Sequence, residues 1–167
     1  LVEGKLNGNL GVAYNTDAGY FKNQFNGDNH GENQSTTYRG ALEWLPTDTL
    51  TFLGKLEYND TRSDGPTGQN RAYFDRYDFD FSINNPGFGE NTTLLGSLRT
   101  DLDVDFGNGV ITNIFGYREY DSTSGGDIDA TPFTLFHSNA EFVQEQFSNE
   151  LRYAGTFDKI DLTTGLF

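Results

Sequence analysis

The residues with the widest scope for binding chemistry lie between positions 73 and 81. This segment reads Tyr-Phe-Asp-Arg-Tyr-Asp-Phe-Asp-Phe, so aromatic rings are interleaved with charged side chains. Aromatic faces stack on sugars or aromatic ligands, and a neighbouring guanidinium or carboxylate can hydrogen-bond the polar edges of such a ligand. The pattern therefore predicts ligand contacts at Tyr73, Phe74, Arg76 and Tyr77. The alternative is a short β-hairpin whose aromatic residues pack on neighbouring loops.

Four basic residues form a second candidate group, because each stands where neighbouring positions of the same segment are apolar. These are Arg39, Lys55, Arg99 and Arg152. They would contact an acidic ligand or another part of the protein. The competing interpretation is a charge ladder with carboxylates that alternate in the same way, namely Glu43, Glu57, Asp101 and Glu150.

Other apparent motifs do not meet their chemical requirements. The run from Asp101 to Gly107 resembles a calcium loop, but an EF-hand needs Gly at its sixth position and Glu at its twelfth. Here Gly is seventh and Thr112 is twelfth. The two histidines, His30 and His137, have no neighbouring nitrogen or sulfur ligand in the sequence. No G-x-S-x-G nucleophile elbow occurs. We therefore expect no catalytic residues, no metal, no cofactor and no enzymatic activity.

Composition excludes further classes. The net charge of −14 argues against nucleic-acid binding, because neutralising phosphates needs clustered Lys and Arg. The chain has no Cys and therefore no disulfides. It also has no Met and begins without a signal-peptide pattern, so we expect a mature product or a piece of a longer protein. No apolar run reaches the roughly 18–20 residues of a membrane helix, so any membrane contact must involve strands.

The elements that must position these residues are predicted by apolar/polar alternation. Residues 5–14 alternate strictly, which gives a strand one oily and one wet face. Six further segments behave similarly. In residues 110–120, however, apolar residues occupy both odd and even positions, so the sequence does not decide which side chains face which side. The seven predicted strands cover residues 5–14, 37–44, 50–59, 94–106, 110–120, 145–153 and 160–167.

Connection lengths alternate too. Short turns are predicted around Pro46, Asn108 and Gly155, and long polar loops near residues 15–35, 60–91 and 121–140. Outer-membrane barrels alternate short periplasmic turns with long extracellular loops in this way. The prediction is an all-β transmembrane antiparallel β-barrel. A soluble antiparallel sandwich is the alternative, but it rarely alternates loop lengths so regularly.

Four segments in the same order resemble the barrel domain of TonB-dependent outer-membrane receptors of Gram-negative bacteria. They are residues 17–23 (DAGYFKN), 38–48 (YRGALEWLPTD), 115–122 (FGYREYDS) and 146–153 (QFSNELRY). The resemblance implies that residues 1–167 are a partial barrel domain, about seven strands of a 22-stranded barrel whose plug domain and remaining strands lie outside this segment. It further implies four partners for the chain: outer-membrane lipid, the plug, TonB acting through the plug, and a small-molecule ligand.

The predicted function is therefore part of a receptor that takes up a siderophore, vitamin or glycan across the bacterial outer membrane. Two rivals stay open: a small complete outer-membrane barrel, and a soluble extracellular carbohydrate-binding or adhesive β-domain. Seven strands leave two open edges, so we expect an arc of antiparallel strands in place of a closed cylinder. In this arc Leu6, Leu10, Leu42, Leu56, Leu98 and Leu102 should face lipid, and the four basic residues the lumen.

Overall fold

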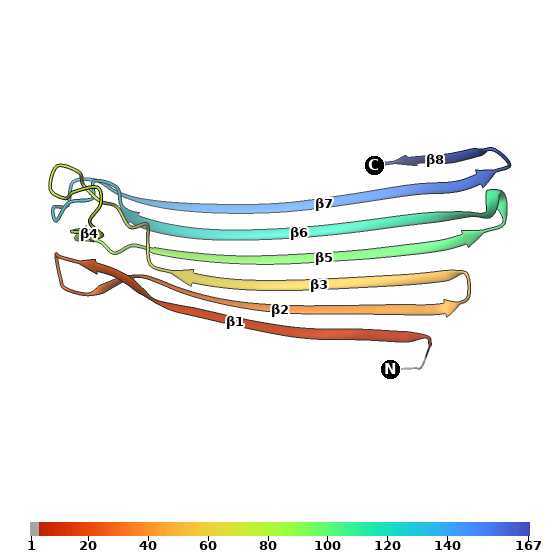
Figure 1. Ribbon diagram of the computed structural model, residues 1–167, viewed down its shortest axis with the longest axis horizontal. Helices are drawn as coiled ribbons and strands as arrows, with labels where there is room; N and C mark the ends of the chain where they lie inside the picture. The colour runs from red at the N-terminus through yellow and green to blue at the C-terminus, as the bar shows by residue number, and fades with distance from the viewer. Residues whose placement is uncertain (1–3) are drawn as a thin grey trace.

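The computed structural model describes residues 4–167, and within this range the protein is all-β (Figure 1). Seven long strands and one two-residue strand make a single sheet. One short 3₁₀ turn, η1 (Phe106–Asn108), interrupts the pattern. The strands are β1 (Leu6–Asn23), β2 (Asn29–Thr47), β3 (Leu50–Ser63), β4 (Asp80–Phe81), β5 (Phe88–Val104), β6 (Gly109–Asp127), β7 (His137–Phe157) and β8 (Ile160–Leu166).

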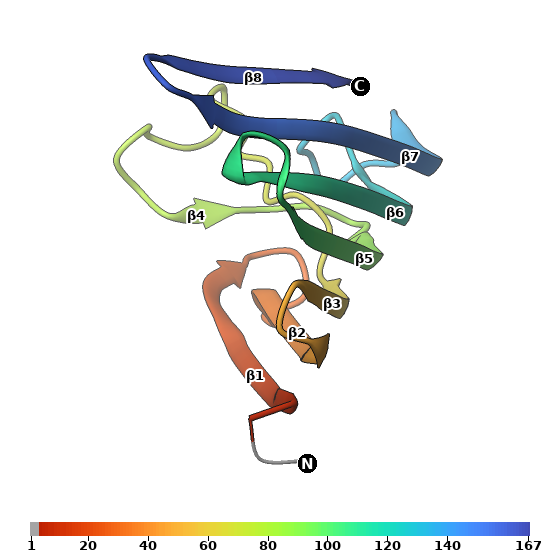
Figure 2. The ribbon, with the colours of Figure 1, turned by 90° about the vertical axis from the view of Figure 1, so that its right-hand side faces the viewer.

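The sheet is an open half-barrel. Its strand order is β4-β1-β2-β3-β5-β6-β7-β8, and every neighbouring pair is antiparallel except β1 and β4. Viewed along the strands, the sheet curls from β1 at one end to β8 at the other (Figure 2). Within the described residues β8 pairs only with β7, so the first strand does not close onto the last. The open arc expected from the sequence is confirmed.

The strand register separates one apolar face from one polar face. Residues opposite each other in neighbouring strands share a face, because side chains alternate along each strand. One such row runs through Leu10, Gly40, Leu56, Gly96 and Tyr117. The row beside it contains Gly8, Leu42, Gly54, Leu98 and Phe115. In each row, a large apolar side chain on one strand is thus paired with a glycine on the next strand, up to β5.

The ambiguous register of residues 110–120 is decided by the pairing of β6 with β5. Phe115 lies opposite Leu98, so Ile111, Phe115 and Tyr117 belong to the apolar face. Ile114 lies opposite Arg99 and belongs to the polar face. Asn113 also belongs to the apolar face, where its amide exchanges hydrogen bonds of 3.1 and 3.3 Å with the amide of Asn149. These two amides on the apolar face therefore satisfy each other.

The strands extend well beyond the bounds that alternation predicts. The long loop expected near 15–35 is only residues 24–28, and the one near 121–140 is residues 128–136. The connection expected at 60–91 covers residues 64–87 and includes β4. The added strand residues in β1, β2 and β6 are mostly polar residues and Gly, on both faces. Alternation disappears there because neither face has to be apolar, while the backbone ladder continues.

The short turns lie close to their predicted places. Asp48 and Thr49 join β2 to β3, and Asp158 and Lys159 join β7 to β8. Between β5 and β6 the turn uses Gly107 and Asn108 with φ of 61° and 43°, a left-handed conformation that favours Gly and Asn. The Tyr153 hydroxyl donates to the Phe106 carbonyl oxygen at 2.6 Å and pins this turn to β7.

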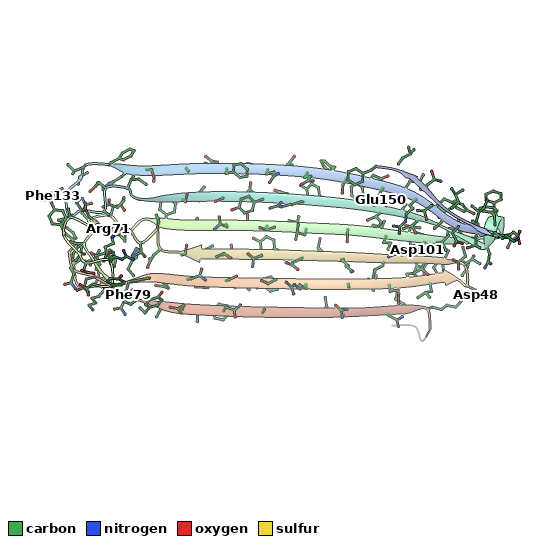
Figure 3. The ribbon with its side chains drawn as sticks, turned by 45° about the horizontal axis from the view of Figure 1, so that its top comes forward. Asp48, Arg71, Phe79, Asp101, Phe133 and Glu150 are labelled. Carbon is green, nitrogen blue, oxygen red and sulfur yellow. The ribbon has the colours of Figure 1, made fainter. Side chains whose placement is uncertain are left out.

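The buried core is small and lies at the end with the long connections. Phe81, Ile83 and Ala130 are buried together, with Phe21 packed against them. Figure 3 shows the crowded side chains at this end, around the labelled Arg71, Phe79 and Phe133, with Asp48 at the opposite end of the strands. The long strands thus form an open sheet, and the packed interior supports the loops at one end of it.

Candidate functional site

The polar face of the curled sheet holds a groove of about 620 Å³ that crosses β1 to β7. Its lining includes Asn9, Lys55, Ser97, Gln146 and Ser148. All five belong to the polar side of the register. This groove therefore lies on the face that carries the basic side chains.

All four predicted basic residues stand on this polar face. Leu10, Leu42, Leu56 and Leu98 stand on the other face of the sheet. Arg39 and Lys55 line the groove. Arg99 and Arg152 lie on the same face nearer the short turns, outside the groove lining. The groove also contains Arg118, which the sequence did not single out, since the register of 110–120 was open. Arg118 is paired with Leu95, which is paired in turn with Glu57 of the polar face. Arg118 therefore belongs to the polar face.

Three of the four basic residues form the expected charge ladder along the polar face, whereas Lys55 and Glu43 do not join it. Arg39 Nε donates to Glu57 at 2.6 Å, Arg99 makes two hydrogen bonds to Asp101 at 2.6 and 3.0 Å, and Arg152 lies 4.0 Å from Glu150. Glu43 instead accepts a hydrogen bond from Asn7 at 3.0 Å. In the described residues no carboxylate is paired with Lys55 or Arg118, so these two cations are the ones available to an anion in the groove.

The predicted aromatic segment lies in the connection between β3 and β5. Tyr73 and Tyr77 are 64% and 76% exposed, and Arg76 and Phe79 are exposed as well, whereas Phe74 is half-buried. The Arg76 guanidinium sits 4.7 Å from the centre of the Tyr77 ring. The segment folds as turns and reaches the sheet only at β4. The alternative of a β-hairpin is therefore wrong, because only Asp80 and Phe81 are in strand conformation.

Side-chain hydrogen bonds hold this loop in shape. The Gln69 amide Nε2 lies 2.8 to 3.1 Å from the carbonyl oxygens of Asp75, Asp78 and Asp80. The loop base is fixed by Asn23, whose buried amide donates to the Ile83 carbonyl oxygen at 2.9 Å and accepts from the Ile83 N–H at 3.1 Å. Exposed aromatic rings thus project from an anchored backbone.

The buried histidine is part of the same anchor. His30 Nε2 lies 3.1 Å from the Gly65 carbonyl oxygen, and its ring packs 5.2 Å from that of Phe81. Asp64 Oδ2 accepts from the backbone N–H groups of Gly31 and Glu32, both at 2.9 Å. His30 therefore has a structural role, linking the β1–β2 turn to the start of the β3–β5 connection.

The second loop, residues 128–136, brings together side chains that the sequence did not connect. Asp127, Asp129 and His137 place one donor atom each within 4.8 Å of one another. Hydrogen bonding by the Thr131 hydroxyl, followed by backbone N–H groups including that of Phe136, lowers the pKa of Asp129. The sequence spacing does not reveal this cluster, because seven loop residues separate Asp129 from His137 before β7 returns along β6.

The two loops contact each other and form one surface. Asn84 donates to the Thr134 hydroxyl at 2.6 Å, and Asn70 donates to the Asp129 carbonyl oxygen at 3.3 Å. Besides Tyr73, Tyr77 and Phe79, large apolar side chains exposed on this surface are Ile128, Phe133, Leu135 and Phe136. The loop end therefore offers aromatic and aliphatic contacts on a hydrogen-bonded base.

Among residues 4–167 no helix is both long and apolar enough to cross a bilayer. No family model, curated protein or solved structure matches the chain.

Proposed function

We propose that this chain forms part of the wall and mouth of a TonB-dependent receptor in the outer membrane of a Gram-negative bacterium. In this role it helps to admit a scarce small ligand such as a siderophore, a vitamin or a glycan. It carries out no chemical reaction on that ligand.

The observation that carries the proposal is a curved single sheet whose apolar face stays exposed. Leu10 is 92% and Phe147 67% exposed on this face, while the other face carries the basic side chains and the groove. A soluble sandwich buries its apolar face between two sheets. Within the described residues the buried hydrophobic side chains are Phe81, Ile83 and Ala130, none of which belongs to the long strands. In an outer-membrane barrel the apolar face would contact lipid and the polar face would line the water-filled interior.

The height of the apolar face suits a bilayer. From Leu6 to Tyr14 the strand rises about 27 Å at about 3.4 Å per residue, and a tilt of about 40° reduces this to about 20 Å, close to the roughly 25 Å band of outer-membrane barrels. Stacked Trp44 and Phe52, with ring centres 5.4 Å apart, stand at the turn end of this band. Tyr38 and Tyr58, paired across β2 and β3, stand toward the other end. Paired aromatic levels are typical of membrane interfaces.

The assignment to TonB-dependent receptors rests on the resemblance of the four sequence segments. The open edges at β1 and β8 are consistent with it, because a sheet that spans lipid must be closed by further strands. They also disfavour the small complete barrel. In the proposal the polar face lines the lumen, where Lys55 and Arg118 meet the plug or an acidic ligand. The exposed aromatic segment around Tyr73, Arg76 and Tyr77 lies on the extracellular side and contacts the ligand.

The test is to express the full-length protein in a Gram-negative host with and without TonB. We expect it in the outer-membrane fraction, extracted only by detergent, and we expect uptake of one labelled ligand from a siderophore, vitamin and glycan panel to require TonB. A protein that stays in solution without detergent would overturn the membrane assignment. Membrane insertion with TonB-independent uptake would overturn the receptor class alone.

A further inference from the structure

A cluster of ligand-type side chains stands where β6 ends and β7 begins. Asp127 is the last residue of β6, His137 is the first of β7, and the two are directly paired in the sheet. The connecting loop folds back so that Asp129 joins them. The sheet register and the loop together therefore bring two carboxylates and one imidazole to one point.

One atom of this cluster lacks the partner that its burial requires. The side chain of Asp127 is completely buried, and its Oδ1 accepts the Ala130 N–H at 2.9 Å. Its Oδ2 has no hydrogen-bond donor among the described residues, and lies 3.9 Å from His137 Nε2. A buried carboxylate oxygen without a donor or a cation is strongly unfavourable. The position therefore calls for a positive charge beside Asp127.

We propose that Asp127, Asp129 and His137 bind a divalent first-row transition-metal ion of the zinc type. Carboxylate oxygen and imidazole nitrogen are ligands that Zn²⁺ accepts. Two ligands bonded to one zinc ion at about 2.1 Å and a tetrahedral angle lie about 3.4 Å apart. The 3.9 Å gap between His137 Nε2 and Asp127 Oδ2 must then close by about half an ångström.

A neighbouring amide oxygen completes the environment. Asn84 Oδ1 lies 3.0 Å from His137 Nε2, and Asn84 belongs to the other long connection. Metal binding at Nε2 would replace this hydrogen bond and leave Asn84 Oδ1 beside the ion as a fourth ligand, the third through oxygen. The ion would thus join the β3–β5 and β6–β7 connections, which already touch through Asn84 and Thr134. The site is independent of the ligand that the proposed receptor takes up.

The experiment adds Zn²⁺, or Co²⁺ as a spectroscopic substitute, to the metal-stripped full-length protein in detergent. We expect one ion bound per chain segment and a visible Co²⁺ spectrum with oxygen and nitrogen ligands. D127N and H137Q should each lower Zn²⁺ affinity by at least about tenfold, as loss of a ligand does. The matched control is D78N, an exposed loop aspartate whose carboxylate makes no hydrogen bond in the described structure.

A second measurement uses only the wild-type protein, so it tests the proposed site even if a variant misfolds. Residues 1–167 contain two histidines, so segmental labelling of this part of the full-length wild-type protein isolates their imidazole resonances. Zn²⁺ should shift the His137 signals and leave those of buried His30 unchanged. Unaltered Zn²⁺ affinity in both variants, or His137 signals that respond to pH but not to Zn²⁺, would overturn the proposal. The latter would make Asp127 the partner of a protonated histidine. Because neither readout involves uptake, a failure here would leave the proposed receptor function standing.

Discussion

At the scale of single residues, the wall is defined by which face each side chain occupies. Leu98 lies opposite Gly54 and Phe115 on the apolar face, whereas its chain neighbour Ser97 lies opposite Lys55 and lines the groove. Two adjacent residues of one strand therefore meet different environments. This makes them a matched pair for testing the proposed orientation.

Replacing Leu98 by Arg should destabilise the membrane-inserted protein by about 2–4 kcal/mol, because the charge would enter hydrocarbon near the midplane. Ser97→Arg should cost little, since its side chain would extend into the aqueous groove. Denaturant unfolding of the full-length protein in lipid vesicles measures both values. Equal costs at the two positions would contradict the assignment of faces.

The amide pair on the apolar face provides a second residue-scale prediction. Asn113 and Asn149 hydrogen-bond each other, and Asn113 also donates to the Glu150 carbonyl oxygen at 3.0 Å. Asn149→Leu should destabilise by about 1–2 kcal/mol because it leaves the Asn113 carbonyl oxygen without a donor. The double replacement by Leu should be close to neutral, since it removes both polar groups. A double-mutant cycle in vesicles measures the coupling, and additive costs would show that the pair does not interact.

At the scale of elements, the long connections act as ordered platforms. The β3–β5 connection is held at its base by Asn23 and His30 and across its tip by Gln69. The rings of Tyr73, Tyr77 and Phe79 are exposed, while the backbone carbonyl oxygens of Asp75, Asp78 and Asp80 are hydrogen-bonded within the loop. An anchored loop loses little conformational entropy when a ligand binds, which favours affinity.

Alanine at Tyr73, Phe74, Arg76 and Tyr77 together should weaken ligand affinity by at least about tenfold, because about 1.4 kcal/mol of lost contact corresponds to that factor. The amount of receptor in the outer membrane should not change. Equilibrium binding of the labelled ligand to whole cells measures the effect, and unchanged affinity would exclude this segment as the contact.

Gln69→Ala is the informative companion variant. It leaves all four side chains in place but removes the amide that holds the carbonyl oxygens of Asp75, Asp78 and Asp80. Faster hydrogen exchange across residues 70–80 with a smaller loss of affinity would separate positioning from direct contact.

At the scale of the whole molecule, the open edges decide how the chain behaves. The outer edge of β1 is covered only at Lys22 and Asn23, where β4 pairs with it, and β8 is unpaired along its outer side in the described structure. Unpaired backbone groups are very costly in hydrocarbon and promote edge-to-edge association in water. In the outer-membrane setting proposed above, the half-barrel would need further strands to close it.

The 167-residue chain alone should not form the heat-modifiable, SDS-resistant band that is typical of a closed barrel, whereas the full-length protein should. Gel electrophoresis with and without boiling tests this. Amides of β1 and β8 should exchange rapidly in the isolated chain and become protected in the full-length protein. A resistant band from the isolated chain would restore the small complete barrel as the better proposal.

The sequence by itself determined the features that depend on neighbouring residues. Alternation around Leu10, Leu42 and Leu98 predicted the strands and the separation of two faces, because the pleat turns successive side chains to opposite sides. The turn at Gly107 was visible because its left-handed conformation favours Gly and Asn, and the β2–β3 turn was visible because Pro46 and Asp48 are residues common in turns. The polar strand extensions were not visible, since with water on both faces nothing imposes alternation.

Only the tertiary structure decided which distant residues meet. The register that puts Arg118 in the groove depends on pairing with β5, and the Asn113–Asn149 pair depends on pairing with β7. Likewise Asp127, Asp129 and His137 converge only when β7 returns beside β6. Such contacts join residues well separated in the chain. Local propensity carries no information about them, because the closure of a loop and the choice of a partner strand are properties of the assembled sheet.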